Sequence, residues 1–358
     1  MKVAIFSAKN YERAILDEVN AAYGHELVYF DVQLGPATVS LAVGFPAVSV
    51  FVNDVVNADV LRRLADAGTR LVATRSTGFN QMDLQAAAAN GVRVVRVADY
   101  SPNSVAEFAV GLLLALNRKI PRAYNRTRDG NFELDGLMGF DFVGRTVAVI
   151  GTGKIGTIFG RIMAGFGCTV IGFDVYRSPE FERIGGRYVD LAEVQAEADV
   201  ISLHCPLTPQ THHIIDGGTL GRLKRGALLI NTSRGGLVDA EAAIEALKSG
   251  QLGGMAIDVY EEEAGLFFKD LSNTVIADDV IERLVSFSNV IVTGHQAFFT
   301  REALRTILDT TLASIADFAA GRPLANEIKG TMDPVSHSLV APTETSGISS
   351  HGARPLPP

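Results

Sequence analysis

The sequence alternates short runs of β-branched and other apolar residues with segments of helical apolar spacing, and it does so in two successive series. This order is typical of βαβ units, in which each crossover adds another parallel strand to a sheet. The strands expected in the first series are residues 2–7, 26–31, 48–52, 70–76 and 92–97. Those expected in the second series are residues 146–151, 169–174, 199–204, 227–233, 253–259 and 289–294. The pattern therefore predicts an α/β fold with two doubly wound parallel-sheet domains.

Two longer helical segments follow the two series of strands, one after each. A long apolar helix, with Ser104 as its expected N-cap, leads the chain out of the first series. A second helical pattern follows Thr300 and is expected to pack back on the first domain, which makes that domain discontinuous. We predict one domain from residues 1–100 plus 299–330, a second from residues 101–298, and a flexible tail at 331–358, which is rich in Ser, Thr, Pro and Gly.

Composition and charge exclude several classes of function. The 358 residues carry a formal net charge of −8 and no cluster of Lys and Arg, which argues against a nucleic-acid partner. The apolar run at residues 108–116 is about half of the ~20 residues needed to cross a membrane. The N-terminal segment does not match a signal peptide, and Cys168 and Cys205 are too few for a disulfide framework. We expect a cytoplasmic protein.

A glycine-rich loop lies between an expected strand and an expected helix of the second domain. Gly151, Gly153 and Gly156 have the G-x-G-x-x-G spacing of a dinucleotide site, in which the backbone and a helix N-terminus approach a pyrophosphate. Asp174 ends the next expected strand, near the separation at which an acidic side chain binds the adenine-side ribose. That carboxylate favours NAD over NADP, although Arg177 would soften the preference. The alternative is a glycine turn needed only for packing.

Polar residues also follow three later strands of the second domain. They are Arg234, the run of carboxylates at residues 261–263, and His295. Open α/β sheets bind ligands at the carboxyl ends of their strands, so these groups are expected to converge. A guanidinium, a carboxylate and an imidazole together would supply a substrate anchor, a partner that raises the pKa of the imidazole, and a proton donor. Taken singly, each is more typical of a surface or capping residue.

These motifs resemble the D-isomer-specific 2-hydroxyacid dehydrogenase family, and most closely its D-lactate dehydrogenase branch, over about residues 1–328. The resemblance rests on the glycine loop, "NTSR" at 231–234, "HCPLT" at 204–208, "ADYSPNSVAEFAVG" at 98–111 and "TGH" at 293–295. In the family, a Glu lies five residues beyond the Asp of a "DVY"-like segment, which selects Glu263. The long segment between Glu263 and His295, and Ala264 where many relatives have proline, favour the lactate branch.

The resemblance implies a role for each candidate. Arg234 would bind the keto oxygen and carboxylate of a 2-oxo acid, His295 would act as the acid and base, and Glu263 would favour the charged imidazole. The substrate would also meet five further residues: Thr77, Gly78, Phe79, Tyr100 and Phe298. The cofactor NAD would meet Gly151, Gly153, Lys154, Ile155, Gly156, Asp174, His204, Cys205, Pro206, Thr232, Ser233 and Asp258.

The function implied is an NAD-dependent D-lactate dehydrogenase that interconverts pyruvate and D-lactate. Two alternatives stay open: a dehydrogenase for bulkier 2-oxo acids such as 2-oxoisocaproate or phenylpyruvate, and an NADH-sensing binding protein like the corepressor relatives of the family. A homodimer or higher homo-oligomer is expected, with contacts from residues 104–116 and 117–132. No metal site is expected, because the adjacent His212 and His213 should point apart and no Cys/His cluster has zinc spacing.

Overall fold

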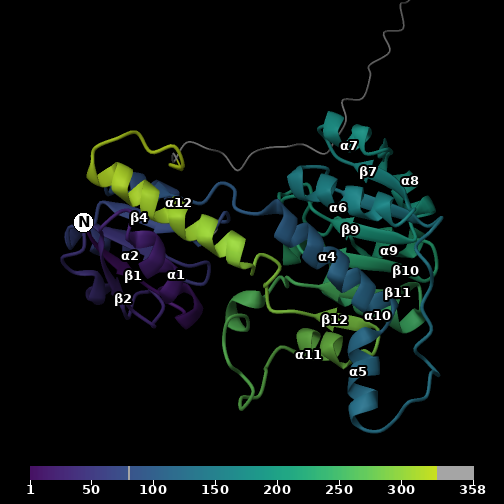
Figure 1. Cartoon of the computed structure of the whole chain (residues 1–358). Helices are drawn as coiled ribbons and strands as arrows, with labels where there is room; N and C mark the ends of the chain where they lie inside the picture. Colours follow the sequence, from purple (N-terminus) through teal and green to yellow (C-terminus); the bar gives the residue numbers. More distant parts are fainter. Residues whose placement is uncertain (80, 329–358) are drawn as a thin grey trace, which may run out of the picture.

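The computed structural model describes residues 1–79 and 81–328 (Figure 1). Within this part of the chain, the paired strands are parallel and form one five-stranded and one seven-stranded sheet. The predicted fold class, with two doubly wound parallel sheets, is confirmed.

The first sheet has the order β2-β1-β3-β4-β5, which is the flavodoxin-like order. Its strands are β1 (Lys2–Ile5), β2 (Glu26–Tyr29), β3 (Ala47–Val50), β4 (Leu71–Thr74) and β5 (Arg93–Val95). Strands β3 and β4 are buried at every position. This burial is expected of parallel strands that helices cover on both faces.

Side chains of the first sheet alternate between its two faces. On one face, Ala4 and Val48 pack with residues of α2 (Ala58–Asp66) and α3 (Leu84–Ala89), near the short helix η1 (Val39–Ala42). On the other face, Val3 and Ala47 pack with residues of α1 (Asn10–Asn20) and α12 (Arg301–Ala319). The period of two along each strand therefore fills two separate hydrophobic layers.

Helix α12 comes from the end of the chain but packs on the first sheet. The Thr300 hydroxyl caps it by accepting a hydrogen bond from the Ala303 amide. Figure 1 shows α12, in yellow-green, beside the purple N-terminal elements. The domain boundaries 1–100 plus 299–330 and 101–298 stay a prediction, and the tail at 331–358 lies outside the described residues.

The second sheet has the order β12-β11-β10-β9-β6-β7-β8, which contains the Rossmann arrangement with one added strand. Its strands are β6 (Thr146–Ile150), β7 (Thr169–Phe173), β8 (Arg187–Tyr188), β9 (Val200–Leu203), β10 (Ala227–Asn231), β11 (Leu252–Ile257) and β12 (Val290–Val292). The order changes direction beside β6, where the crevice between β6 and β9 opens at their carboxyl ends.

Helices cover both faces of the second sheet. One face packs against α4 (Pro102–Asn117) and α6 (Lys154–Gly165). The other packs against α8 (Leu191–Glu197), α9 (Gly217–Arg222), α10 (Ala240–Ser249) and α11 (Asp279–Ser286). Helix α5 (Ile120–Arg128) directly follows α4. Three short helices follow strands: α7 (Pro179–Arg183), η2 (Gly235–Leu237) and η3 (Glu263–Gly265).

The start of α4 differs from the expectation. Ser101, not Ser104, is the N-cap, and its hydroxyl accepts a hydrogen bond from the Ser104 amide at 3.3 Å. Pro102 then occupies the first helical turn, where its missing N–H costs nothing. The expected N-cap at Ser104 is wrong because the proline belongs to the helix and not to the turn before it.

Strand β8 was not expected, because two residues are too few for a periodic pattern.

No helix among residues 1–79 and 81–328 has the length and apolar content needed to cross a bilayer.

Candidate active site

The glycine loop joins the carboxyl end of β6 to the first turn of α6. Gly151 has φ of +95°, and a Cβ there would overlap the backbone at Cys205. A Cβ on Gly156 would overlap the carbonyl of Gly151. These two glycines are thus required by packing, whereas Gly153, the N-cap of α6, has open space where a side chain would be. The backbone at Gly153 is consequently accessible to a ligand.

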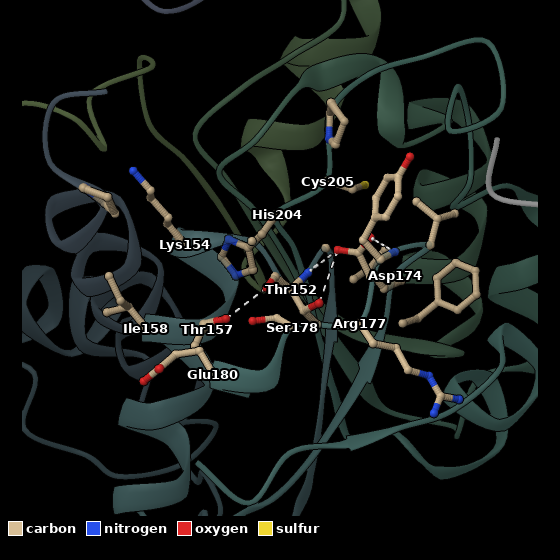
Figure 2. Close-up of a pocket in the computed structure, with 18 of the residues that line it drawn as sticks. Thr152, Lys154, Thr157, Ile158, Asp174, Arg177, Ser178, Glu180, His204 and Cys205 are labelled. Carbon is tan, nitrogen blue, oxygen red and sulfur yellow. Dashed lines mark hydrogen bonds between the residues drawn. The ribbon is translucent and has the colours of Figure 1, made fainter. Parts of the chain in front are cut away.

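A cavity of about 600 Å³ lies beside this loop, along the carboxyl ends of β6, β7 and β9 (Figure 2). Seven of the residues predicted to bind the cofactor line it: Gly151, Gly153, Lys154, Asp174, His204, Cys205 and Pro206. Thr152, Thr157, Arg177 and Ser178 line it as well. A long cavity that begins at a helix N-terminus and ends beside a carboxylate matches the shape and charge of a dinucleotide.

The Asp174 carboxylate is fixed at the wall of this cavity. One of its oxygens accepts hydrogen bonds from the Thr152 amide (2.6 Å) and hydroxyl (3.3 Å), and the other accepts one from the Tyr176 amide (3.1 Å). An ionised carboxylate has further lone pairs, so Asp174 can still accept hydrogen bonds from ribose hydroxyls. Figure 2 shows the Arg177 guanidinium extending away from Asp174, and it lies 5.5 Å from the Tyr188 ring.

His204 and Cys205 form another part of the wall, and both are uncharged. Burial lowers the pKa of His204 to about 3, and its Nε2 lies 2.8 Å from the Ser202 hydroxyl. Burial raises the pKa of the Cys205 thiol to about 12. A neutral imidazole and a protonated thiol fit packing against a cofactor rather than nucleophilic chemistry.

A second cavity, of about 200 Å³, is enclosed by residues from both parts of the chain. All three predicted catalytic residues, Arg234, Glu263 and His295, line it. So do four of the predicted substrate-binding residues: Thr77, Gly78, Tyr100 and Phe298. The topology therefore brings together polar groups that are more than 200 residues apart in sequence.

An imidazole–carboxylate pair forms one side of the second cavity. Nδ1 of His295 lies 2.8 Å from Oε1 of Glu263, and the other Glu263 oxygen accepts a hydrogen bond from the Tyr260 amide at 3.0 Å. His295 has φ of +54°, a left-handed conformation, and its amide donates to the Asp258 carbonyl at 2.8 Å. Since Nδ1 is engaged by Glu263, Nε2 is the ring nitrogen that remains for a ligand.

Arg234 forms the facing side, on the loop that follows β10. Its carbonyl accepts a hydrogen bond from the Asn231 side chain (2.8 Å). Its guanidinium lies beside Gly78, where a Cβ would be 3.2 Å from Nη2. Burial raises the pKa of the Tyr100 hydroxyl, and the charge of Arg234 opposes that rise. A cation, a phenol and the loop at Gly78 thus border the same space, which suits a small carboxylate.

Five lining residues of the second cavity were missed by the sequence analysis: Phe51, Val52, Gln81, Phe268 and Ile307. Phe51 follows β3 at the carboxyl end of the sheet. Ligands bind at the carboxyl ends of parallel strands, so the reasoning that identified the catalytic residues could also have identified Phe51. Arg75 also lines the cavity and begins the loop at 75–80 that was expected to meet the substrate, but nothing in the sequence indicates that Arg75 is buried. Phe268 lies on an irregular segment with φ of +63°, and no local pattern marks it.

Arg75 is fully buried beneath the loop that carries Thr77 and Gly78. Its Nε donates to Glu12 at 3.1 Å, and its other nitrogens reach the Ser49 hydroxyl and the carbonyl oxygens of Phe6 and Ser7. The ion pair with Glu12 is almost inaccessible to solvent. Arg75 is thus a fixed support for the floor of the cavity.

Several predicted residues line neither cavity. They are Phe79, Ile155, Gly156, Thr232, Ser233 and Asp258. The Phe79 ring lies under the Arg96 guanidinium, and the Ser233 hydroxyl donates to the Cys205 carbonyl at 2.7 Å. The buried Thr232 hydroxyl has no hydrogen-bond partner among the described residues. Thr232 is adjacent to Ser233, which contacts the cavity-lining Cys205, so the unpaired Thr232 hydroxyl fits a site that a polar cofactor completes.

Asp258 stabilises the loop at 293–297, which carries His295. Its carboxylate is fully buried and accepts hydrogen bonds from the Thr293 hydroxyl (2.5 Å) and from the amides of Gln296 (2.9 Å) and Ala297 (2.7 Å). Burial raises the pKa of Asp258, and these hydrogen bonds oppose the rise. Asp258 thus holds the loop that carries His295, and its expected position beside the cofactor stays a prediction.

His212 and His213 do not point apart as expected. Their rings stack with centroids 3.9 Å apart, and their Nε2 atoms lie 3.0 and 2.9 Å from the two oxygens of Glu261. His213 has φ of +51°. The expectation assumed a regular helix or strand, whereas a left-handed residue places the two adjacent side chains on one side of the chain.

Comparisons with known proteins agree with this architecture. Residues 110–297 match the family described as D-isomer specific 2-hydroxyacid dehydrogenase, NAD binding domain. The chain is 51% identical to a 2-hydroxyacid dehydrogenase homolog of Schizosaccharomyces pombe, with 89% of this chain and 97% of the relative covered. It is 48% identical to the D-lactate dehydrogenase of Escherichia coli, with coverage of 92% and 100%.

A solved structure is also similar over nearly the whole chain. The pyruvate reductase of Chlamydomonas reinhardtii superposes with a TM-score of 0.87 at 42% identity, with 91% of this chain and 98% of that chain covered. NAD is the cofactor of the matched domain, and the open backbone at Gly153, the Asp174 carboxylate and the unpaired Thr232 hydroxyl fit it. The chain is an NAD-dependent oxidoreductase, and it belongs to the D-isomer specific 2-hydroxyacid dehydrogenase family.

Proposed function

We propose that this protein is an NAD-dependent D-lactate dehydrogenase, which interconverts pyruvate and D-lactate. The observation that carries the proposal is that Arg234 and the His295–Glu263 pair line one small cavity. Relatives named D-lactate dehydrogenase, among them the E. coli enzyme at 48% identity, support the choice of substrate.

Arg234 is assigned to the anchoring of the 2-oxo acid. During reduction the keto oxygen gains negative charge, so a fixed cation beside it stabilises the transition state more than the ground state. The forked guanidinium can bind the carboxylate of the substrate at the same time. The loop at Thr77 and Gly78, with the Tyr100 hydroxyl, would supply further hydrogen bonds to that carboxylate.

His295 is assigned to proton transfer. The chemistry that the bound nicotinamide supplies is hydride exchange with the carbon of the substrate. In pyruvate reduction, the Nε2–H of His295 protonates the keto oxygen, and in lactate oxidation the neutral Nε2 accepts the hydroxyl proton. Glu263 accepts the Nδ1–H, so it fixes the orientation of the ring and stabilises the imidazolium form.

The walls of the second cavity favour a small substrate. Phe51, Phe268 and Phe298 line a volume of about 200 Å³ together with the catalytic residues. The rings of Phe51 and Phe268 meet edge to face at 5.2 Å, which leaves little room for a large side chain. This enclosure supports pyruvate over 2-oxoisocaproate and phenylpyruvate.

Steady-state oxidation of NADH with a panel of 2-oxo acids tests the proposal. We expect the highest kcat/KM with pyruvate, and a product that is D-lactate by chiral chromatography. A large excess of kcat/KM for phenylpyruvate would favour the dehydrogenase for bulkier acids. Tight NADH binding without oxidation by any 2-oxo acid would favour the corepressor-like binding protein.

The oligomeric contact is also a proposal, and the structure changes where we place it. The apolar residues of α4 are mostly buried in its own domain, so residues 104–116 offer little free apolar surface. The second expected segment, residues 117–132, has exposed apolar side chains at Ile120, Tyr124 and Phe132. Leu134, Met138 and Val143, which follow it, are each at least 75% exposed. Such a surface is typical of a contact between subunits, and a second copy of this chain is the proposed partner.

Light scattering of the purified chain tests the assembly. We expect a dimer or a higher homo-oligomer, and the double variant Leu134→Asp/Met138→Asp should shift it toward monomer. A monomeric wild type would remove the proposal. We also propose a cytoplasmic location, which the free thiols of Cys168 and Cys205 support and cell fractionation would test.

A further inference from the structure

A compact cluster of potential metal ligands lies outside both cavities. It consists of His212, His213 and Glu261, and one ligand atom from each residue lies within 4.8 Å of the others. None of the three lines either cavity. The side chains are accessible, with exposed fractions of 49%, 33% and 36%. An ion in solvent could therefore reach them directly.

Backbone contacts hold the loop at 212–213 and the segment that carries Glu261 next to each other. Thr211 fixes the turn before the histidines, since its hydroxyl donates to the Pro206 carbonyl at 2.7 Å. The His213 amide then donates to the Gly236 carbonyl at 2.8 Å. On the other side, Gly235 packs so closely on the backbone of Glu261 that a Cβ would overlap it. The ligands thus converge because two loops are each packed against the segment at 235–236.

The charge of the cluster favours a cation. Glu261 contributes a carboxylate whose two oxygens face the Nε2 atoms of His212 and His213 at 3.0 and 2.9 Å. Among the described residues, its ion-pair partners are these two histidines, and neither carries a permanent charge. A metal ion binds the neutral form of each imidazole, so the ligand set that it meets is two neutral nitrogens and one negative carboxylate.

We propose that His212, His213 and Glu261 bind a divalent transition-metal ion, for which Zn²⁺ is the best match. Two imidazole nitrogens and one carboxylate oxygen are ligands typical of zinc, whereas Mg²⁺ and Ca²⁺ prefer oxygen ligands alone. Tetrahedral zinc places its ligands about 3.3 Å apart, given bonds of about 2.0 Å. The Nε2–Oε distances of 3.0 and 2.9 Å need to open by only a few tenths of an ångström. Water would complete the coordination from the exposed side.

Binding would cross-link the loop at 212–213 to the segment that continues into Glu263. The ion would lie outside the substrate cavity, so we expect it to act on stability and not as a catalytic ion. A ligand that binds only the folded state raises the thermal midpoint by mass action. Zinc should therefore raise the Tm of the full chain.

Isothermal titration of the metal-free full chain with ZnCl₂ tests the site. We expect the wild type to bind at least one more tight equivalent of Zn²⁺ than the double variant His212→Ala/His213→Ala. Glu261→Gln should weaken that binding at least tenfold. With CoCl₂ as the probe, the wild type should show the visible absorption bands of a tetrahedral ion, and the double variant should lack them.

The matched control removes two histidines elsewhere. His337→Ala/His351→Ala, in the part of the chain outside the described residues, should leave zinc binding and the Tm increase unchanged. If the loss of binding follows this control pair instead, the proposed site is wrong. An equal response to MgCl₂, or unchanged zinc binding in the His212/His213 variant, also overturns the proposal. If the double variant does not fold by circular dichroism, the single variant His212→Ala decides, and tenfold weaker zinc binding is required of it.

Discussion

Nδ1 of His295 lies 2.8 Å from Oε1 of Glu263, although the two residues belong to different loops of the second domain, after β12 and after β11. His295 has a left-handed backbone conformation, and its amide donates a hydrogen bond to the Asp258 carbonyl. Together these features orient the ring toward the Glu263 carboxylate. Because this contact occupies Nδ1, Nε2 is the nitrogen that can exchange a proton with a substrate in the cavity. The assignment of His295 as acid and base depends on this contact.

Replacement of His295 by Gln should lower kcat by about 10²- to 10⁴-fold, because general acid–base catalysis contributes that much. The affinity for NADH, measured by fluorescence titration, should change little, since His295 lines the second cavity and not the first. An equal loss of turnover and of NADH binding would show that the residue is structural. Glu263→Gln is the companion variant, because it keeps an acceptor for Nδ1–H but removes the charge that stabilises the imidazolium form.

Replacement of Asp174 by Asn should weaken NADH binding and reduce the discrimination against NADPH. The amide oxygen can still accept the hydrogen bond from the Thr152 amide, so the glycine loop should keep its shape. What is lost is the negative charge that repels a 2′-phosphate. The ratio of kcat/KM for NADH and NADPH measures the effect. An unchanged ratio, with the protein folded, would remove Asp174 from the ribose site.

Replacement of Arg75 by Met should destabilise the protein by about 3–5 kcal/mol, because it leaves the buried Glu12 carboxylate without its partner. The exposed Arg62–Asp59 pair offers a matched control, and Arg62→Ala should cost less than about 1 kcal/mol. Chemical denaturation of the three proteins measures both changes. The double variant Arg75→Met/Glu12→Leu should recover part of the loss. A cost as small as that of Arg62→Ala would mean that Arg75 is not needed to hold the floor of the cavity.

The strand–helix alternation was sufficient to predict both sheets apart from the two-residue strand β8, because parallel strands buried on two faces are apolar at nearly every position. The catalytic candidates could be located for a related reason, since Arg234, Glu263 and His295 all follow strands of one sheet. Residues whose position depends on tertiary packing could not be located. Phe268 is in an irregular segment, and the hydrogen bonds of Asp258 to the 293–297 loop depend on how that loop packs.

The contact between His212 and His213 also could not be predicted from the sequence, in this case because of the local backbone conformation. Adjacent side chains diverge in any regular element, so the sequence pattern argued against contact between His212 and His213. A single left-handed residue, His213, reverses that outcome. Positive φ in a residue other than glycine has no reliable sequence signal, because it is imposed by the surrounding contacts.

The last prediction concerns pH and the partly buried His204. Its pKa is lowered to about 3 by burial, whereas the unfolded chain has a histidine pKa near 6.5. Below about pH 6.5 the unfolded state therefore binds a proton that the folded state does not, so the stability from this residue is complete above that pH and declines as the pH falls. Between about pH 7 and pH 5 the expected loss is about 1–2 kcal/mol. Urea denaturation of the wild type and of His204→Gln, which can keep the contact with Ser202, measures it. The variant should lose less stability than the wild type over this range, and equal losses would show that His204 takes up a proton in the folded state.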